Sequence, residues 1–365
     1  MRIALRPCGR NFWCDMLMND AVEFLIRLLR TPSLSGQEAA AIQVMVAQMA
    51  AFGWEAFVDE SGSAVGQVGT DGPLVVLLGH IDTVPGEIPV RIEDGKLYGR
   101  GAVDAKGPLA TFVWAARRAE QAGTLGCRLV IIGATEEEAA SSRGAHAARD
   151  RYRPDFCVIG EPSGWDRITL GYKGRLLVHY RYQQPVAHSA GEQRAAPEQM
   201  VDFWQAVEQY CQHLNAGRTR LFEQLIPSLR RVHSDSDGIN EWVEATIGFR
   251  LPPGVEPATL ADTLQSLAGA AHLSFDGACP AFQSSRTTPL ASAFVRAIRQ
   301  HGGQPAFLHK TGTADMNVVG PVWQCPIVAY GPGDSRLDHT PDEHIVLHEY
   351  EQAIAVLADV LAQLR

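Results

Sequence analysis

The residues best suited to chemistry in this chain are a histidine and two aspartates that follow an apolar run. Residues 74–78 are apolar at every position, which is typical of a strand buried on both faces, and His80 and Asp82 follow directly. Asp104 lies in a later glycine-flanked connection, just before apolar residues at helical spacing. Because ligands of open α/β sheets bind beyond the carboxyl ends of the strands, we expect His80 and Asp104 to share a site.

Three further apolar segments end in groups that could bind a metal ion. These segments are 127–133 before Glu136, Glu137 and Glu138, 156–160 before Glu161, and 326–331 before Asp338 and His339. Each group has a simpler interpretation, since a His beside an Asp is usually a hydrogen-bonded structural pair, and adjacent glutamates are typical of an acidic first helical turn. Their repeated placement at strand ends nevertheless favours one shared site.

If these groups converge, they form a ligand set for two divalent cations. The set comprises His80, Asp104, Glu138, Glu161 and His339. Two imidazoles and three carboxylates suit Zn²⁺, with Co²⁺ or Mn²⁺ as alternatives. A single catalytic zinc takes only three protein ligands, so five ligands favour two metals with one carboxylate bridging them. Two such ions would acidify a bridging water molecule and stabilise an anionic tetrahedral intermediate.

Hydrolysis at such a site also needs a base that is not a ligand. Of the adjacent Glu137 and Glu138, one can bind a metal while the other takes a proton from water and gives it to the leaving nitrogen, and Glu136 could be confused with either. Asp82 could hold the second nitrogen of the His80 imidazole and raise its basicity, or it could be a simple turn residue.

Length and composition restrict the class of protein. The chain has 365 residues, 46% of them apolar, which suggests two domains with ordinary cores. No apolar run approaches the roughly 20 residues of a membrane helix and no secretory signal is visible, so we expect a cytoplasmic protein without membrane partners. Seven cysteines without a CxxC pair indicate neither a disulfide framework nor a thiolate zinc site.

The charge gives one further indication of partners. A net charge of −9 argues against nucleic acid as a general partner. A local basic cluster could still form a patch, although such clusters are usually solvated faces; it comprises Arg218, Arg220, Arg230 and Arg231.

The pattern of elements predicts an α/β fold with a discontinuous, mostly parallel-sheet catalytic domain. Alternating strands and helices occupy 19–171 and resume over 280–365, whereas 172–279 reads as an inserted α+β domain with one open sheet face. We expect Asp20 to cap the first helix, and Ser35 with Glu38 to form a capping box before the second. Residues 1–18 fit no predicted element.

Several motifs together resemble the di-zinc aminoacylase/carboxypeptidase family, which includes succinyl-diaminopimelate desuccinylase and acetylornithine deacetylase. The motifs are GHIDTVPG, YGRGAVDAKGPLA, TEEEAA, IGEP and LDHTPDE. The resemblance implies that His80 and Glu161 bind one metal, Glu138 and His339 bind the other, and Asp104 bridges them. It also implies that Glu137 is the general base, that Asp82 is the acid beside the first histidine, and that the Asp104–Ala105 peptide is cis.

The resemblance also implies a lid that forms a homodimer and contacts the substrate. His188 in VAHSAG would reach the partner's site and hold the oxyanion; the simpler alternative is an ordinary loop histidine. Asn240 and Arg250 would grip the substrate carboxylate, unless they are a turn residue and a surface ion pair. Thr313 would belong to a substrate loop, which here reads GTADMN rather than the commoner GGTSD, and Lys310 would join it.

Within that family, the motifs most closely resemble hydrolases that release lysine or ornithine from an amino-group carrier protein. This implies a metal-dependent amidohydrolase of lysine or arginine biosynthesis, which cleaves the amide between the carrier's terminal γ-glutamyl group and the amino acid. The carrier in that family is acidic, which would give the basic cluster a role. The alternatives are a deacetylase or aminoacylase acting on free N-acyl amino acids, and a metal-binding homologue without activity. A serine hydrolase is disfavoured because no GxSxG motif occurs.

Overall fold

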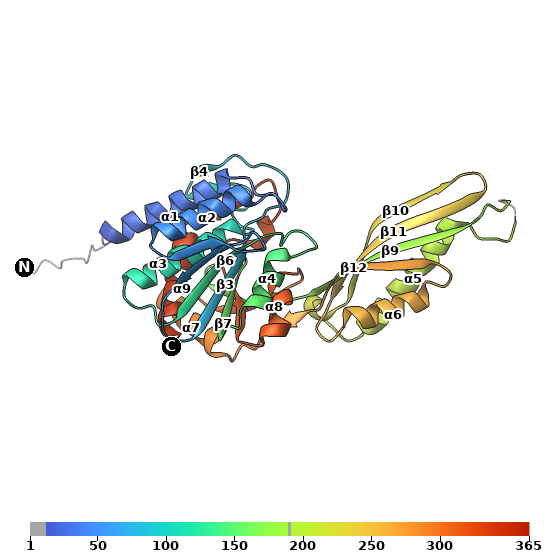
Figure 1. The fold of residues 1–365 in the computed structure, drawn as a ribbon. Helices are drawn as coiled ribbons and strands as arrows, with labels where there is room; N and C mark the ends of the chain where they lie inside the picture. The colour runs from blue at the N-terminus through green and yellow to red at the C-terminus, as the bar shows by residue number, and fades with distance from the viewer. Residues whose placement is uncertain (1–11, 189–190, 365) are drawn as a thin grey trace, which may run out of the picture. The chain divides into compact units, whose positions relative to one another are not determined.

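The computed structural model describes residues 12–188 and 191–364, with side chains from Met18 onward. The chain forms two compact units, of which unit 1 comprises the chain up to Ile168 together with Arg286–Phe307 and the segment from Cys325, and unit 2 comprises Thr169–Ser285 and Leu308–Gln324 (Figure 1). The predicted domain boundaries stay a prediction.

The sheet of unit 1 places the ends of three parallel strands at one edge. Its strands are β1 (Glu55–Val58), β2 (Ala64–Val68), β3 (Leu74–His80), β6 (Arg128–Ala134), β7 (Phe156–Gly160) and β15 (Ile327–Ala329). They are hydrogen-bonded in the order β1-β2-β6-β3-β7-β15. Strands β6, β3, β7 and β15 run parallel to one another, whereas β2 is antiparallel to both β1 and β6. Since His80 pairs with Ala134 and Gly79 with Gly160, the segments that follow β3, β6 and β7 leave the sheet together.

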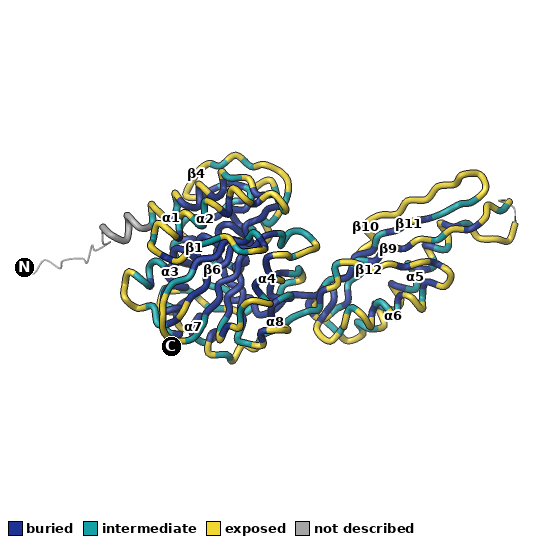
Figure 2. The backbone as a smooth tube through the Cα atoms, viewed as in Figure 1, coloured by how far each residue is buried: buried dark blue, intermediate teal, exposed yellow. Residues whose placement is uncertain are grey.

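Helices bury the apolar strands of this sheet. They are α1 (Phe12–Arg30), α2 (Ala39–Ala51), α3 (Lys106–Gln121), α4 (Arg143–Arg151), α7 (Pro289–Gln300) and α9 (Leu347–Gln363). Helix α3 packs on β3, β6 and β7 and also contacts α9. The approach is close because Gly79 and Gly160 have no side chain: a Cβ on Gly160 would lie 2.9 Å from a Phe112 ring carbon. Figure 2 shows the buried residues concentrated in these central strands.

A small antiparallel sheet brings the end of the chain beside the Asp104 segment. It consists of β4 (Arg91–Glu93), β5 (Lys96–Tyr98) and β16 (His344–Val346), with β5 in the middle. The short helix η2 (Ser335–Leu337) lies between β15 and β16. Because β16 pairs with β5, the residues just before β16 lie near the loop that follows β5.

Unit 2 contains a four-stranded antiparallel sheet with helices on one face. Its strands are β9 (Gly174–Pro185), β10 (Ile226–Ser236), β11 (Asn240–Leu251) and β12 (His272–Cys279), in the order β10-β11-β9-β12. Helices α5 (Ala196–Leu214) and α6 (Pro257–Leu267) cover the apolar face and form a core with it. Strand β10 is an exposed edge (Figure 2). The remaining elements are η1 (Leu221–Glu223), β8 (Arg167–Tyr172), β13 (Phe282–Gln283), β14 (Ala306–Lys310) and α8 (Asp315–Trp323).

The predicted fold class is confirmed, but two predicted helix starts are wrong. Helix α1 begins at Phe12, so Asp20 lies exposed within it and not at its N-cap; residues 1–11 lie outside the described part of the chain. The side chain of Ser35 caps no helix, because its hydroxyl donates to Asp82 instead. In the described residues, no helix is both long enough and apolar enough to cross a membrane.

Candidate functional site

Five side chains predicted from the sequence to bind metal ions converge at the carboxyl edge of the unit 1 sheet. They form two groups: His80, Asp104 and Glu161, and Asp104, Glu138 and His339. Within each group, one nitrogen or oxygen atom from every member lies within 4.8 Å of the others. Ligand atoms bound to one zinc ion at about 2.1 Å are separated by roughly 3 to 4 Å, so small side-chain adjustments would bring either group to that geometry.

Asp104 belongs to both groups because its two oxygens face different histidines. Its Oδ1 lies 3.1 Å from His80 Nε2, and its Oδ2 lies 3.1 Å from His339 Nε2. Glu161 Oε1 lies 4.0 Å from the same His80 nitrogen, and Glu138 Oε1 lies 2.9 Å from the same His339 nitrogen. The peptide bond between Asp104 and Ala105 is cis, as the family resemblance implies. A carboxylate placed in this way can bridge two cations.

The two groups differ in their exposure to solvent. The side chain of His80 is 1% exposed, whereas that of His339 is 49% exposed. His80 is the last residue of the buried strand β3, while His339 lies in a loop, with its backbone in the left-handed region at a φ of 60°. The His80 group is therefore an interior site and the His339 group faces solvent.

Asp82 fixes the orientation of the His80 ring. His80 Nδ1 lies 3.1 Å from the backbone oxygen of Asp82 and 3.4 Å from its Oδ1. A proton on Nδ1 satisfies both oxygens, which leaves the Nε2 lone pair directed at Asp104 and Glu161. The Asp82 carboxylate also accepts hydrogen bonds from the backbone N–H groups of Glu137, at 3.1 Å, and Glu138, at 3.0 Å.

The three adjacent glutamates are not the acidic first turn of a helix. They lie in a loop between β6 and α4, where Glu136 has a φ of 60°. Glu138 turns toward His339, whereas Glu136 accepts a hydrogen bond from Ser141 and faces Arg143 on the exposed side. The half-buried Glu137 lies close enough to His80 for its charge to raise the pKa of that histidine. The structure thus separates three residues that the sequence alone could not distinguish.

The electrostatic field of the site favours positive charge. Burial opposes the charged form of His80, but hydrogen bonds to Asp104 and Asp82 raise its pKa well above the ordinary value. The hydrogen bond to Asp104 raises the pKa of His339 to about 9, against the effect of burial. Burial would raise the pKa of Asp104, yet hydrogen bonds from His339 and His80 hold it below its usual range. Burial and the charge of Asp104 raise the pKa of Glu138.

Glu343 is a buried residue that the sequence analysis did not single out. Its Oε1 accepts hydrogen bonds from the backbone N–H groups of Val103, at 2.9 Å, and Asp104, at 3.1 Å. Its Oε2 forms a 2.7 Å ion pair with Arg100. Glu343 thereby holds the backbone that carries Asp104. The sequence feature that could have identified Glu343 is its place as the last residue of the LDHTPDE motif.

The predicted substrate residues in unit 2 are only partly brought together. Arg250 donates a 2.7 Å hydrogen bond to the hydroxyl of Thr313, and Lys310 lies over the ring of Tyr172 at 6.0 Å. Asn240 lies at the opposite end of β11 from Arg250, roughly 30 Å away for an extended strand. A single carboxylate therefore cannot contact both within one chain.

His188 also lies in unit 2 and is exposed, beside the undescribed residues 189–190. Its predicted role toward an oxyanion, like the roles of the other substrate residues, stays a prediction.

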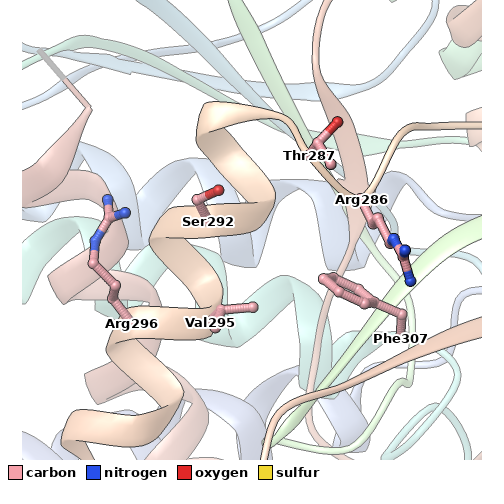
Figure 3. A pocket seen from close by; sticks show the side chains of 6 residues that line it. All are labelled: Arg286, Thr287, Ser292, Val295, Arg296 and Phe307. Carbon is pink, nitrogen blue, oxygen red and sulfur yellow. The ribbon is translucent and has the colours of Figure 1, made fainter.

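A separate hollow on unit 1 does not contain any predicted site residue. It is lined by Arg286, Thr287, Ser292, Val295, Arg296 and Phe307. Figure 3 shows that its two arginine side chains point in different directions and do not converge. Arg296 is also engaged by Gln363, to which its Nε donates a 2.9 Å hydrogen bond. The hollow therefore lacks the convergent polar groups of a binding site.

The domain is built on parallel strands and carries two groups of potential metal ligands that share one aspartate. This combination is typical of a class of metal-dependent hydrolases. Comparison with known families agrees, because residues 76–363 match peptidase family M20/M25/M40. The chain belongs to this family, which confirms the predicted resemblance.

Two relatives show where the chain falls within the family. It is 45% identical to the LysW-lysine hydrolase of Deinococcus radiodurans, over 94% of this chain and 97% of that protein. It is 41% identical to a protein of Thermococcus kodakarensis named provisionally as a LysW-lysine/LysW-ornithine hydrolase, over 95% of this chain and 92% of that protein.

Solved structures share the fold at much lower identity. The M20 family metallo-carboxypeptidase of Sulfolobus solfataricus has a TM-score of 0.78 at 18% identity, covering 94% of this chain and 98% of that one. A dinuclear metal-binding peptidase of the M20 family from Bacillus subtilis has a TM-score of 0.71 at 14% identity, covering 96% of this chain and all of that one (100%).

We expect the Arg100–Glu343 pair to stabilise the segment that carries Asp104. The Glu343 side chain is 1% exposed and that of Arg100 is 14% exposed, so replacing Arg100 with Met leaves a buried carboxylate without its counter-charge. Loss of one partner of a buried ion pair lowers the free energy of unfolding by about 3 kcal/mol. We expect this loss to appear as a lower urea midpoint of unfolding. Arg336→Met is the control, because the side chains of its pair with Asp334 are 88% and 43% exposed, and it should leave the midpoint unchanged. Equal midpoints for the two variants would contradict the expectation.

Proposed function

We propose that this protein is a two-metal amidohydrolase that releases lysine, or ornithine, from the γ-glutamyl terminus of an amino-group carrier protein. The observation that carries the proposal is the pair of ligand groups sharing Asp104, with Glu137 beside the ligand Glu138. The carrier-linked substrate is supported by the 45% identity to a LysW-lysine hydrolase over nearly the whole of both chains.

The donor set fits two divalent cations, for which Zn²⁺ is the best candidate and Co²⁺ or Mn²⁺ are alternatives. His80 and Glu161 would hold one cation, His339 and Glu138 the other, and Asp104 both. Three carboxylates leave the two dications with a small net positive charge. When bound, the cations would polarise the amide carbonyl and lower the pKa of a water molecule.

In this proposal the chain's own residues supply proton transfer and orientation. Glu137 takes a proton from the attacking water, whose oxygen forms a bond to the amide carbon. As the carbon–nitrogen bond breaks, Glu137 returns the proton to the leaving amino group. Asp82 acts at a distance from the substrate: it holds the proton on His80 Nδ1 and ties down the backbone of Glu137.

Unit 2 offers a basic surface that could bind an acidic carrier. Arg230 and Arg231 are exposed on the edge strand β10, at the point where a bulge interrupts its pairing with β11. The Arg230 side chain lies against Gly248, where an added Cβ would meet its Nε at 2.5 Å. Arg218 and Arg220 are instead engaged by Glu223, through its backbone oxygen and its carboxylate respectively. We therefore propose Arg230 and Arg231 as the part of the basic cluster that contacts the carrier.

A chelator should remove the metal in two stages and abolish activity at the first. Because His339 is 49% exposed and His80 is 1% exposed, a chelator should withdraw the cation of the His339 group first. We expect metal content to fall from two equivalents to one before it reaches zero, with hydrolysis lost at the first stage and restored by added Zn²⁺. Metal content per chain and turnover are measured on the same samples. Full activity of metal-free protein would overturn the two-metal proposal.

Replacing Glu137 with Gln should separate catalysis from metal binding. The variant keeps the backbone N–H that donates to Asp82 but loses the base, so kcat should fall by about 10² to 10⁴ while two metal equivalents remain bound. Glu136→Gln is the matched control, since the Glu136 side chain faces Ser141 and Arg143, and it should retain activity. Unchanged turnover in the Glu137 variant would refute the assigned base.

A two-substrate assay tests both the substrate and the carrier surface. Wild-type protein should hydrolyse carrier-linked lysine more efficiently than N-acetyl-lysine, and the opposite preference would favour a deacetylase or aminoacylase. Replacing Arg230 and Arg231 with Glu should raise KM for the carrier-linked substrate about tenfold or more and spare N-acetyl-lysine.

The matched control for this variant is the replacement of Arg286 and Arg296 with Glu, which makes the same change of charge at exposed positions of unit 1. It should leave both reactions unchanged. Equal loss on both substrates in the Arg230/Arg231 variant would reject the proposed carrier surface.

A further inference from the structure

The loop between α1 and α2, residues 33–38, contacts the two segments that carry the proposed catalytic groups. Its sequence, SLSGQE, predicts a capping box, yet neither Ser35 nor Glu38 caps α2 with its side chain. Ser33 and Glu38 are buried, and Ser35 is partly buried. The side chains of Ser33, Ser35 and Glu38 are therefore directed into unit 1.

One end of the loop is fixed to the segment that follows β3. Ser33 Oγ donates a 2.7 Å hydrogen bond to the backbone oxygen of Ile81, and the Thr83 N–H donates to the backbone oxygen of Ser33 at 2.9 Å. Between these two contacts, Ser35 Oγ donates a 2.7 Å hydrogen bond to Asp82 Oδ2. The loop thus holds both the backbone around Asp82 and its carboxylate.

The other end of the loop is fixed to the glutamate segment that follows β6. Glu38 is 5% exposed, and its Oε1 accepts hydrogen bonds from the N–H groups of Gly36, at 2.9 Å, and Glu136, at 3.1 Å. Glu136 has a left-handed φ of 60°, which few residues other than glycine adopt without compensation. The Glu38 carboxylate therefore stabilises the turn that directs the next two N–H groups toward Asp82.

Asp82 joins these two sets of contacts, and its carboxylate is fully engaged. Oδ2 accepts from Ser35 and from the Glu138 N–H, while Oδ1 accepts from the Glu137 N–H and faces His80 Nδ1 at 3.4 Å. An ionised carboxylate offers about four acceptor positions, so all of them are used. Loss of the Ser35 hydroxyl would allow this carboxylate to rotate.

We propose that Ser35 and Glu38 are positioning residues that set where Glu137 lies relative to the His80 group. The inference rests on the proposed function, because it concerns the same site. Neither residue touches the reacting atoms; both act through Asp82 and the backbone of residues 136–138. Outer partners of this kind typically change activity or metal affinity by 10- to 100-fold when they are removed.

The first measurement reports on position without requiring activity. Backbone hydrogen exchange in peptides covering residues 134–140 should accelerate at least tenfold in Ser35→Ala and in Glu38→Ala. In Glu38→Ala the Glu136 N–H loses its acceptor, and in Ser35→Ala the Asp82 carboxylate that accepts from the Glu137 and Glu138 N–H groups is no longer held by the hydroxyl. Peptides within α9 should not change. Thr31→Ala is the matched control, since it removes a nearby hydroxyl that donates only to the Arg27 backbone oxygen, at 2.8 Å.

The second measurement separates positioning from general stability. In Ser35→Ala and Glu38→Ala, kcat on carrier-linked lysine should fall 10- to 100-fold, with KM changed less than about threefold and two Zn²⁺ equivalents retained. Ser35→Thr, which keeps the hydroxyl, and Glu38→Gln, which keeps an acceptor oxygen, should restore most of the activity. The temperature of unfolding should be similar in all four variants.

The outcomes distinguish this inference from the proposed function. If wild-type protein hydrolyses neither carrier-linked lysine nor N-acetyl-lysine, the proposed function fails, and hydrogen exchange alone decides whether the loop positions residues 136–138. If the wild type is active but exchange and kcat in both alanine variants match the Thr31→Ala control, the positioning role is refuted. A loss of kcat that the conservative variants do not rescue, accompanied by early unfolding, would also overturn it.

Discussion

The structure depends on holding three carboxylates close together at the edge of one sheet. Asp104, Glu138 and Glu161 would repel one another in a partly buried site, and that repulsion grows as solvent is excluded. Two histidines offset part of it, as the raised pKa values of His80 and His339 show. Backbone N–H groups stabilise the charges of two further carboxylates nearby, those of Asp82 and Glu343. The remaining negative field is what would favour two cations.

The register of the strand pairing brings these carboxylates together, not the flexibility of the loops. In-register parallel pairing of β3 with β6 and β7 brings His80, the glutamate segment and Glu161 to one edge. The close contact of Gly79 with Gly160 lets α3 pack directly on these strands. Because Asp104 lies just before the first residue of α3, this packing fixes its distance from the sheet. A shift of one residue in any of these pairings would turn the following side chain to the other face.

Much of this could be predicted from the sequence, because strands buried on both faces are continuous apolar runs. Those runs located β3, β6 and β7 and therefore the ligand types at their ends. The structural role of Ser35 and Glu38 could not be found in this way, since their spacing also fits a capping box, and only tertiary contacts decide between the two. The start of α1 was predicted wrongly because Asp is a residue type typical of the N-cap, whereas Asp20 lies on the exposed surface within the helix. Strand β10 was missed because most of its residues are exposed, so it lacks a clear apolar alternation.

The order of the chain also bears on how the site forms. Four of the five proposed ligands lie before residue 162, yet His339 comes near the end of the chain, and Glu343, which holds the Asp104 backbone, follows it. Pairing of β16 with β5 and of β15 with β7 brings this last part of the chain back to the sheet. The inserted unit 2 therefore interrupts a domain whose site is incomplete until both parts have folded together. Because Arg100 and Glu343 pair across that interruption, completion of the site and stability of unit 1 depend on the same contact.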